Sequence, residues 1–558
     1  MPRPTLGGSV VRRHVLALVI LCISGCRGDL STPAAAVPEL SGSEISEYMR
    51  TLSSDAFLGR GPGSPGGRMA ADYIASHFRA FGLEGPAGSY LQPFPIVGNL
   101  PVAETVSLRF TSVGGAVRAG YLDDFVLNPG NPEAEHAEGE GELVFVGYGI
   151  DAPDEEWDDF DGVDVRGKYL LILVNDPPAP AGEPDRFGGV AMTYYGRWTY
   201  KYEEAARQGA LGALVIHETE RAGYPWSVVR GGFAGEQFSL PPDPMGPAPP
   251  ELVGWISHDL AREVLSLGGY DFEELKESAA TRGFNALPTG ITVRGALDSR
   301  VRRVDTQNVV GVLPGSERPD EYVLVTAHYD HFGVGEPIDG DSIYNGAYDN
   351  ASGTALIMTM GHALASMQPA PARSIVFIAT GAEEQGLLGA EWYVQAPLFP
   401  LDRTVAELNF DGANLWGVTT DAVVRGADRS ELGAYVQTRA TEMGITLLPD
   451  PDPQAGMFFR SDHFPFARAG VPSLYIEHGR QYVGRPPGWG DRIQAEYTAN
   501  HYHAPSDEFS DGFVFDGAVQ QGRLGMLTIL DIAGDESWPA WYDGQEFKTV
   551  RDEMMADR

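Results

Sequence analysis

The sequence predicts an α/β protein whose main sheet is mixed, mostly parallel and flanked by helices. Two observations lead to this fold class. In the C-terminal half, short and almost continuously apolar strands alternate with helical segments, which is typical of strands buried on both faces of a sheet. Histidines and acidic residues directly follow several of these strands, at the edge where open α/β sheets bind their ligands.

Length and charge limit the classes of protein. The chain has 558 residues, enough for two or three structural units. Its net charge is −37, from 77 acidic and 40 basic residues. A surface of this sign repels phosphate backbones, so we expect no nucleic-acid partner and interpret the charge as favouring solubility.

Residues 1–26 are predicted to be a lipoprotein signal peptide. Arginines precede the apolar run HVLALVILCISGC, which is too short to span a membrane. The segment ISGC resembles a bacterial lipobox, so we expect Cys26 to carry a lipid; the alternative is an ordinary secretory signal. Export to the bacterial cell envelope follows, with membrane contact only through this lipid. Neither Cys22 nor Cys26 is then left as a thiolate ligand, so a metal site must use His, Asp and Glu.

The N-terminal half begins with helices and continues as a β-rich unit. Residues 27–40 are rich in Pro and Ala and are predicted to be a tether. A helix is expected to begin near Ser41 or Ser43, because Ser41 and Glu44 have the spacing of a capping box. A second helix is expected over roughly 67–81, after the loop GRGPGSPGG. The β-rich unit is predicted from strands at 142–149, 168–176 and 211–218 and a helix at 200–210.

The C-terminal half supplies the predicted main sheet. Its expected strands are 308–313, 322–327, 374–379, 405–410 and 471–477. Its expected helices are 351–365, 386–394, 430–444 and 522–533.

Residues of the types that can bind metals follow these strands. They are His328 and Asp330 after the strand 322–327, Glu383 and Glu384 after 374–379, Asp411 after 405–410, Asp349 before a helix, and His501, His503 and Asp507 in a later loop. Each has an ordinary alternative: Asp349 as a helix cap, the glutamates as first-turn acids, Asp411 as a turn residue. Because the set recurs at successive strand ends, it predicts a divalent metal site.

Six motifs carry a resemblance to one enzyme family. They are HYDH, YDNASGTA, TGAEEQGLLGA, NFD, SDHFPFARAGVPSLY and YHAPSD. In order and spacing they resemble the co-catalytic di-zinc exopeptidases, which include bacterial leucyl aminopeptidases and aminopeptidase Y and are related to glutamate carboxypeptidase and transferrin receptor. Residues 142–218 resemble the protease-associated domain inserted in this family. The resemblance implies an N-terminal part of the peptidase domain at 41–125, a protease-associated domain at 126–297, a catalytic domain at 298–540 and a C-terminal tail at 541–558.

The resemblance also implies two zinc ions per chain. His328 and Asp411 would bind one ion, Glu384 and His503 the other, and Asp349 would bridge both. It further implies a cis peptide bond between Asp349 and Asn350. Two departures bear on this assignment. Many relatives have Met where this chain has Gly412, and the related glutaminyl cyclases keep much of the constellation with a single zinc.

The remaining site residues are expected to support the reaction. Glu383 is assigned as the general base, which takes a proton from water and returns it to the leaving amine. Asp330, two residues beyond His328, is expected to accept the imidazole N–H. Asp462 is expected to support the site in a similar way. Tyr502 is expected to donate a hydrogen bond to the oxyanion, with a packing role as the alternative. His331 and His501 lie beside expected ligands and receive no role.

These residues predict an exported zinc exopeptidase that acts on peptides, with an aminopeptidase as first choice. Acidic groups near the metals would hold a free α-amine. A carboxypeptidase or dipeptidase would need a basic residue for the terminal carboxylate, and Arg460, Arg480 and Arg485 keep that alternative open. A non-catalytic binding module like transferrin receptor is the third reading; the complete ligand set and base favour an enzyme.

Overall fold

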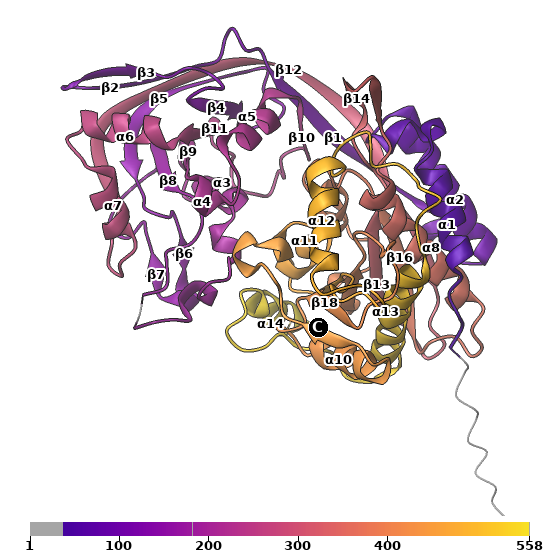
Figure 1. Cartoon of the computed structure of the whole chain (residues 1–558). Helices are drawn as coiled ribbons and strands as arrows, with labels where there is room; N and C mark the ends of the chain where they lie inside the picture. Colours follow the sequence, from indigo (N-terminus) through magenta and orange to yellow (C-terminus); the bar gives the residue numbers. More distant parts are fainter. Residues whose placement is uncertain (1–36, 181, 557) are drawn as a thin grey trace, which may run out of the picture. The chain divides into compact units, whose positions relative to one another are not determined.

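A mixed sheet carries the predicted metal ligands in the computed structural model, which describes residues 37–180, 182–556 and 558 (Figure 1). The predicted signal peptide with Cys26, and positions 27–36 of the predicted tether, lie outside the described residues. The strands follow the order β19 (Thr446–Leu448), β18 (Asp421–Arg425), β20 (Ser473–Ile476), β17 (Thr404–Asn409), β13 (Arg318–His328), β16 (Arg373–Thr380) and β12 (Leu287–Leu313), and β1 (Leu91–Pro101) pairs with β12. The strands β20, β17, β13 and β16 are parallel, whereas β12 and β18 run antiparallel to their neighbours in this group. The predicted fold class is therefore confirmed.

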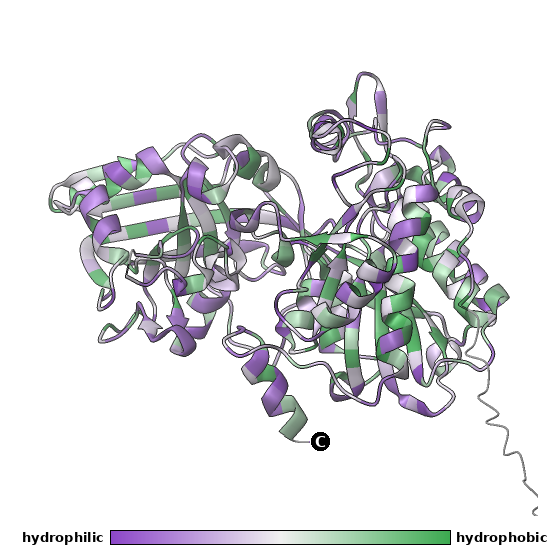
Figure 2. Ribbon diagram, turned by 60° about the horizontal axis from the view of Figure 1, so that its bottom comes forward, coloured by the Kyte–Doolittle hydropathy of each residue, from purple (hydrophilic) through white to green (hydrophobic). Residues whose placement is uncertain are grey.

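Helices cover both faces of this sheet. Alternate residues of β13 and β16 point to opposite faces, with Val323 and Phe377 in one apolar cluster and Leu324 and Val376 in another. The first face is covered by α1 (Gly42–Leu52), α2 (Pro65–Phe81), α8 (Gly353–Ala365), α10 (Leu432–Glu442) and α13 (Asp516–Gly534). The second face is covered by α9 (Leu388–Gln395) and α11 (His463–Arg468). Figure 2 shows the hydrophobic residues concentrated on these strands and on the helix sides that meet them.

The first helix begins where the sequence predicts. Ser41 is the N-cap of α1, and its side chain accepts a hydrogen bond from the backbone N–H of Glu44. The Glu44 carboxylate does not complete a reciprocal capping box. It accepts from the Tyr48 hydroxyl instead, and it lies 2.6 Å from His362 Nδ1. The cap is thus confirmed in its serine half.

The β-rich unit has its own sheet, which shares the strand β12 with the main sheet. Its order from β12 is β5 (His136–Phe145), β8 (Tyr169–Leu173), β9 (Gly212–His217), β11 (Leu252–Ser257) and β4 (Phe125–Pro129), and β2 (Ser107–Ser112) also pairs with β12 and with β3 (Gly115–Arg118). Its helices include α3 (Trp198–Arg207), α6 (His258–Leu267) and α7 (Phe272–Ala279). Leu108, Phe110 and Val117 join its apolar cluster, so this unit takes in residues well before position 126.

The last residues form a helix where the sequence predicts a tail. The helix α14 covers Lys548–Ala556, and the buried rings of Trp541 and Phe547 pack in the apolar cluster of the β-rich unit. The Tyr194 backbone N–H also donates to Glu546 at 2.9 Å, which joins the β-rich unit to the C-terminal segment. In the part of the chain with assigned positions, no helix combines the length and apolarity that a membrane span requires.

Candidate metal centre

Strand register brings the predicted ligands to one edge of the main sheet. The strand β13 ends at His328, which pairs with Thr380 at the end of β16, and Thr326 pairs with Asn409 at the end of β17. Because the three strands are parallel, the residues that follow them meet at the same edge. Two connections complete the set: the turn before α8 carries Asp349, and the loop after α12 (Trp489–Asn500) carries His503.

Asp349 lies at the centre of two ligand groups. Its Oδ1 is 3.2 Å from His328 Nε2, and its Oδ2 is 3.4 Å from His503 Nε2. His328 Nε2 lies 3.2 Å from Asp411 Oδ1, and His503 Nε2 lies 3.2 Å from Glu384 Oε2. The structure therefore brings all five predicted ligands together as two sets that share one carboxylate. The Asp349–Asn350 peptide bond is cis, as the family resemblance implies.

The donor set fits zinc. Each set offers one imidazole nitrogen and carboxylate oxygens, which is the usual chemistry of zinc sites without cysteine. The carboxylates of Asp349, Glu383, Glu384 and Asp411 are mostly buried. Across residues 37–180 and 182–556, no Lys or Arg lies within 4.0 Å of these four groups; their only close ionic contacts are to histidines. Buried carboxylates without a Lys or Arg partner favour the binding of cations.

The adjacent glutamates have different surroundings. Glu384 places Oε1 2.5 Å from His331 Nδ1 and Oε2 3.2 Å from His503 Nε2. Burial and repulsion from Asp349 raise the pKa of Glu384. The interactions with His331 and His503 outweigh them, so the pKa of Glu384 lies below its usual range. Glu383 is 3.8 Å from His328 Nε2 at its nearest approach. Burial, with repulsion from Asp411 and Glu384, raises the pKa of Glu383 well above its usual range. A neighbouring pair with opposite shifts is typical of divided acid–base roles.

His331 is a site residue that sequence reasoning left without a role. Its side chain is fully buried, and Nδ1 must donate to the Glu384 carboxylate, which can only accept. This contact occupies Oε1 of Glu384 and leaves Oε2 facing His503 and the Asp349 group. The signal in the sequence is the second histidine of HYDH, three residues after the expected ligand His328.

Asp330 does not make the predicted contact. His328 Nδ1 lies 3.3 Å from the backbone carbonyl of Asp330 and 3.9 Å from its carboxylate. The carboxylate accepts instead from the backbone N–H of Glu383 at 3.0 Å. The prediction was wrong because β13 ends at His328, so the rule that alternate residues share a side no longer applies to Asp330. The carboxylate of Asp330 thus holds the backbone of the expected base, and the imidazole faces the Asp330 backbone carbonyl instead.

The other two expected supporting residues lie close to the ligands. The Asp462 carboxylate accepts a hydrogen bond from Thr380 at the end of β16, and burial raises its pKa to about 7. Tyr502 is 49% exposed, and its ring stacks on His503 with 3.7 Å between the ring centres. The oxyanion contact expected of Tyr502 stays a prediction.

Tyr348 accounts for glycine after Asp411. A Cβ at Gly412 would lie 3.0 Å from the ring of Tyr348, and the backbone of Gly412 has φ +91°, which favours glycine. Glycine at position 412 therefore suits both the nearby ring of Tyr348 and this backbone conformation.

Ser461 holds the outer oxygen of Asp411. Its hydroxyl donates to Asp411 Oδ2 at 2.7 Å and accepts from Asn409 Nδ2 at 2.7 Å, and the side chain is buried. Asp411 Oδ1 is thereby left to face His328. Sequence reasoning missed Ser461, because a single serine before Asp462 carries no periodic or motif signal.

Ser461→Ala is expected to weaken zinc binding by about 10- to 100-fold, the usual effect of removing a group that orients a metal ligand. The measurement is competition for zinc against a chelator. Ser473→Ala is the matched control, because Ser473 is buried in β20 and its hydroxyl donates to the Val471 carbonyl and to none of the proposed ligands. Equal zinc affinity in the two variants would contradict this role of Ser461.

Arg60 joins the N-terminal helices to the segment that follows His328 and to the segment that precedes Asp349. Its guanidinium is fully buried and donates to the carbonyls of Tyr329 (2.6 Å), Leu52 (2.9 Å), Asn345 (2.5 Å) and Gly346 (2.8 Å). Burial lowers its pKa to about 10, against the raising effect of nearby carboxylates. Gly59, the first residue of the loop GRGPGSPGG, lets this loop pack closely against Gly333. A Cβ at Gly59 would lie 2.4 Å from the Gly333 carbonyl oxygen.

Arg60→Met is expected to lower the free energy of unfolding by about 3–5 kcal/mol, because several buried carbonyls lose their donor. Denaturant unfolding measures this change. Arg523→Met, on the exposed side of α13, is the control and should stay within about 0.5 kcal/mol of the unmodified protein. A similar small change in both variants would show that Arg60 does not hold the two segments.

The chain is similar in sequence to known peptidases. Residues 308–514 match Peptidase family M28. The chain is 27% identical over 333 residues to aminopeptidase NAALADL1 of Rattus norvegicus, covering 51% of this chain and 40% of that protein. It is 24% identical over 494 residues to the probable glutamate carboxypeptidase AMP1 of Arabidopsis thaliana, covering 79% and 62%. Among solved structures, the aminopeptidase from Aneurinibacillus sp. strain AM-1 matches with a TM-score of 0.49 and 17% identity, covering 89% of this chain and 94% of that one. The chain thus spans less than two thirds of the length of these curated relatives.

Proposed function

Since its residues 308–514 belong to peptidase family M28, we propose that this chain is a zinc-dependent metallo-exopeptidase that removes amino-terminal residues from peptides. One observation carries the proposal: the two oxygens of Asp349 face different histidines, each with a further carboxylate beside it. This arrangement suits two ions held by one shared ligand. We further propose that the protein acts in the bacterial cell envelope, anchored by a lipid on Cys26.

Three residues would hold each of the two proposed zinc ions. His328, Asp411 and Oδ1 of Asp349 would hold one, and His503, Glu384 and Oδ2 of Asp349 the other. Three ligands leave positions free for reactants. Zinc at such a site polarises the scissile carbonyl and acidifies a water molecule.

Glu383 moves the proton in the proposed reaction. As the water oxygen attacks the carbonyl carbon, a Glu383 oxygen takes the water proton. When the carbon–nitrogen bond breaks, Glu383 returns that proton to the amine nitrogen, which leaves a carboxylic acid and a free amine. Its backbone is held in place, because its carbonyl accepts from Gly386 and Leu387 at 2.8 Å and its N–H donates to Asp330.

Charge around the site favours the amino end of the substrate. The ligand carboxylates suit a protonated α-amine, and two arginines that a carboxypeptidase could use are engaged elsewhere. Arg480 pairs with Asp491 at 3.3 Å, and Arg485 lies over the Trp489 ring at 4.7 Å. Both partners belong to α12. A terminal carboxylate would therefore lack a free guanidinium from this pair. Arg460, the third arginine, keeps the carboxypeptidase alternative open, because its buried Nε has no hydrogen-bond partner among the described residues.

The test combines metal analysis with two substrates. Purified protein is analysed for zinc and assayed with leucine p-nitroanilide and with a peptide reporting release of its carboxyl-terminal residue. We expect zinc in the protein and cleavage of the anilide. Cleavage only at the carboxyl end would replace the aminopeptidase by a carboxypeptidase. Protein that holds no zinc and cleaves neither substrate would overturn the enzyme and favour a binding module.

A further inference from the structure

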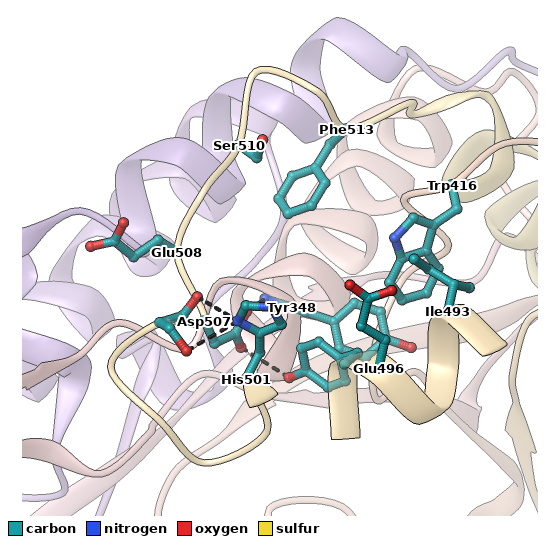
Figure 3. A pocket seen from close by; sticks show the side chains of 11 residues that line it. Tyr348, Trp416, Ile493, Glu496, His501, Asp507, Glu508, Ser510 and Phe513 are labelled. Carbon is teal, nitrogen blue, oxygen red and sulfur yellow. Dashed lines mark hydrogen bonds between the residues drawn. The ribbon is translucent and has the colours of Figure 1, made fainter. Parts of the chain in front are cut away.

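A cavity lies beside the metal centre, and none of the proposed zinc ligands lines it. Its volume is about 300 Å³. It is enclosed by α12, the loop that carries Trp416 and the segment 506–513, and its lining side chains are drawn in Figure 3. The cavity approaches the metal centre through Asp507, which accepts from the backbone N–H of Asp349 at 3.1 Å.

Aromatic rings form one wall of this cavity. The ring centres of Tyr348 and Tyr497 are 4.6 Å apart, and those of Tyr348 and Trp416 are 5.2 Å apart. The hydroxyls of both tyrosines are engaged: Tyr348 with His478 and Tyr497 with Asp507, each at 3.1 Å. The wall therefore offers mainly ring surface to an occupant. Ring faces attract cations through their quadrupole.

The charged groups of the cavity are all acidic. Glu496, Asp507 and Glu508 line it, and no Lys or Arg is among its lining residues. Glu496 and Glu508 are exposed and enter no ion pair within the described ranges. Carboxylates beside aromatic rings favour a positively charged group over a neutral one or an anion.

Beside this cavity, an arginine of the protein itself is bound by an aromatic ring and a carboxylate. A neighbouring cavity shares Ser510 and Phe513 with the first. There the Arg50 guanidinium lies 4.0 Å from the Phe509 ring centre and 2.5 Å from Asp511 Oδ1. The segment 506–513 thus supplies both ring and carboxylate to a guanidinium on one side.

We propose that the cavity binds a guanidinium or primary ammonium group on an aliphatic stem. The group would lie against Trp416 and Tyr348 with Glu496 as the counter-charge, because Glu496 extends beside Trp416 whereas Glu508 points away from the rings (Figure 3). The volume of the cavity is at the low end for ligand sites, so it suits a side chain and not a whole peptide. The cation could come from a basic side chain of the peptide substrate, which rests on the proposed function, or from a free amine, which does not.

Binding of two neutral-capped amino acids tests the proposal by titration calorimetry. N-acetyl-L-arginine amide is expected to bind, and N-acetyl-L-citrulline amide, its uncharged isostere, to bind at least about tenfold more weakly. Glu496→Gln and Trp416→Leu should each weaken the arginine ligand by roughly 3- to 30-fold. Glu277→Gln is the control, since it changes the net charge equally at an exposed position of α7. Equal binding of the two ligands, or none, would overturn the proposal.

Kinetics then separate the two sources of the cation. If the substrate supplies it, Glu496→Gln raises KM for arginine anilide without changing kcat, leaves leucine anilide unaffected, and the arginine ligand competes with substrate. If a free amine supplies it, the arginine ligand changes turnover of both anilides without competing. Protein that binds the arginine ligand but hydrolyses nothing keeps this site and rejects the proposed function instead.

Discussion

Glu383→Gln is expected to abolish peptide hydrolysis while the protein keeps its metal ions. The substitution preserves the shape of the side chain but removes the group that accepts a proton. Glu383 is 3.8 Å from the nearest ligand nitrogen, farther than any of the contacts that join the two ligand groups. We expect turnover of leucine p-nitroanilide to fall by about 10²- to 10⁴-fold. The zinc content of the same preparation should not change.

Glu384→Gln is the matched comparison, because it makes the same chemical change one residue later. Its Oε2 lies 3.2 Å from His503 and its Oε1 2.5 Å from His331, so an amide there disturbs a ligand. This variant should lose zinc as well as turnover. The division of roles would be refuted by a Glu383→Gln protein that keeps activity within tenfold of the unmodified enzyme, or one that loses zinc as Glu384→Gln does.

The main sheet and its ligands were accessible from the sequence because two strong signals coincide. Strand residues such as 375–379 are all apolar, since both faces are covered by helices. Parallel strands end at one edge, so the polar residues after them must meet. That physical rule places His328, Glu384 and Asp411 together without any knowledge of loop paths.

The supporting contacts were not accessible, because they depend on the path of the backbone. Ser461 reaches Asp411 and Arg60 reaches Tyr329 across large separations in sequence. No periodicity records such contacts. The error at Asp330 has the same origin, since the strand ends before it. The helix α6 is different: Ser257 caps it and its buried residues follow helical spacing, so the signal was present and went unused.

The adjacent residues Glu383 and Glu384 show both what the sequence predicts and what it does not. Different roles were predicted for the two acids from the sequence, and their surroundings in the structure differ. Two histidines contact Glu384, whereas Asp330 holds the backbone of Glu383 and leaves its carboxylate free of hydrogen bonds from its described neighbours. The assignment of base and ligand therefore depends on residues outside the doublet.

Asp349→Asn is expected to weaken binding of both zinc ions, in contrast to substitutions that affect one. Its two oxygens belong to different ligand groups, so a single change removes a charged donor from each. We expect zinc affinity to fall by more than about 100-fold, beyond the effect of losing an orienting group. Added zinc should then no longer raise the melting temperature, because stabilisation by a ligand depends on its affinity for the folded protein.

Glu407→Gln is the control for placing an amide in the buried strand β17. Burial raises the pKa of Glu407 well above its usual range, and the side chain already accepts from the Thr326 hydroxyl at 2.6 Å, so a neutral amide should be tolerated. Zinc titration of both variants, by chelator competition and by thermal unfolding, gives the comparison. If Asp349→Asn lost one zinc equivalent and kept the second at unchanged affinity, the two ligand groups would be independent, and the shared carboxylate on which the proposed two-ion site depends would have to be abandoned.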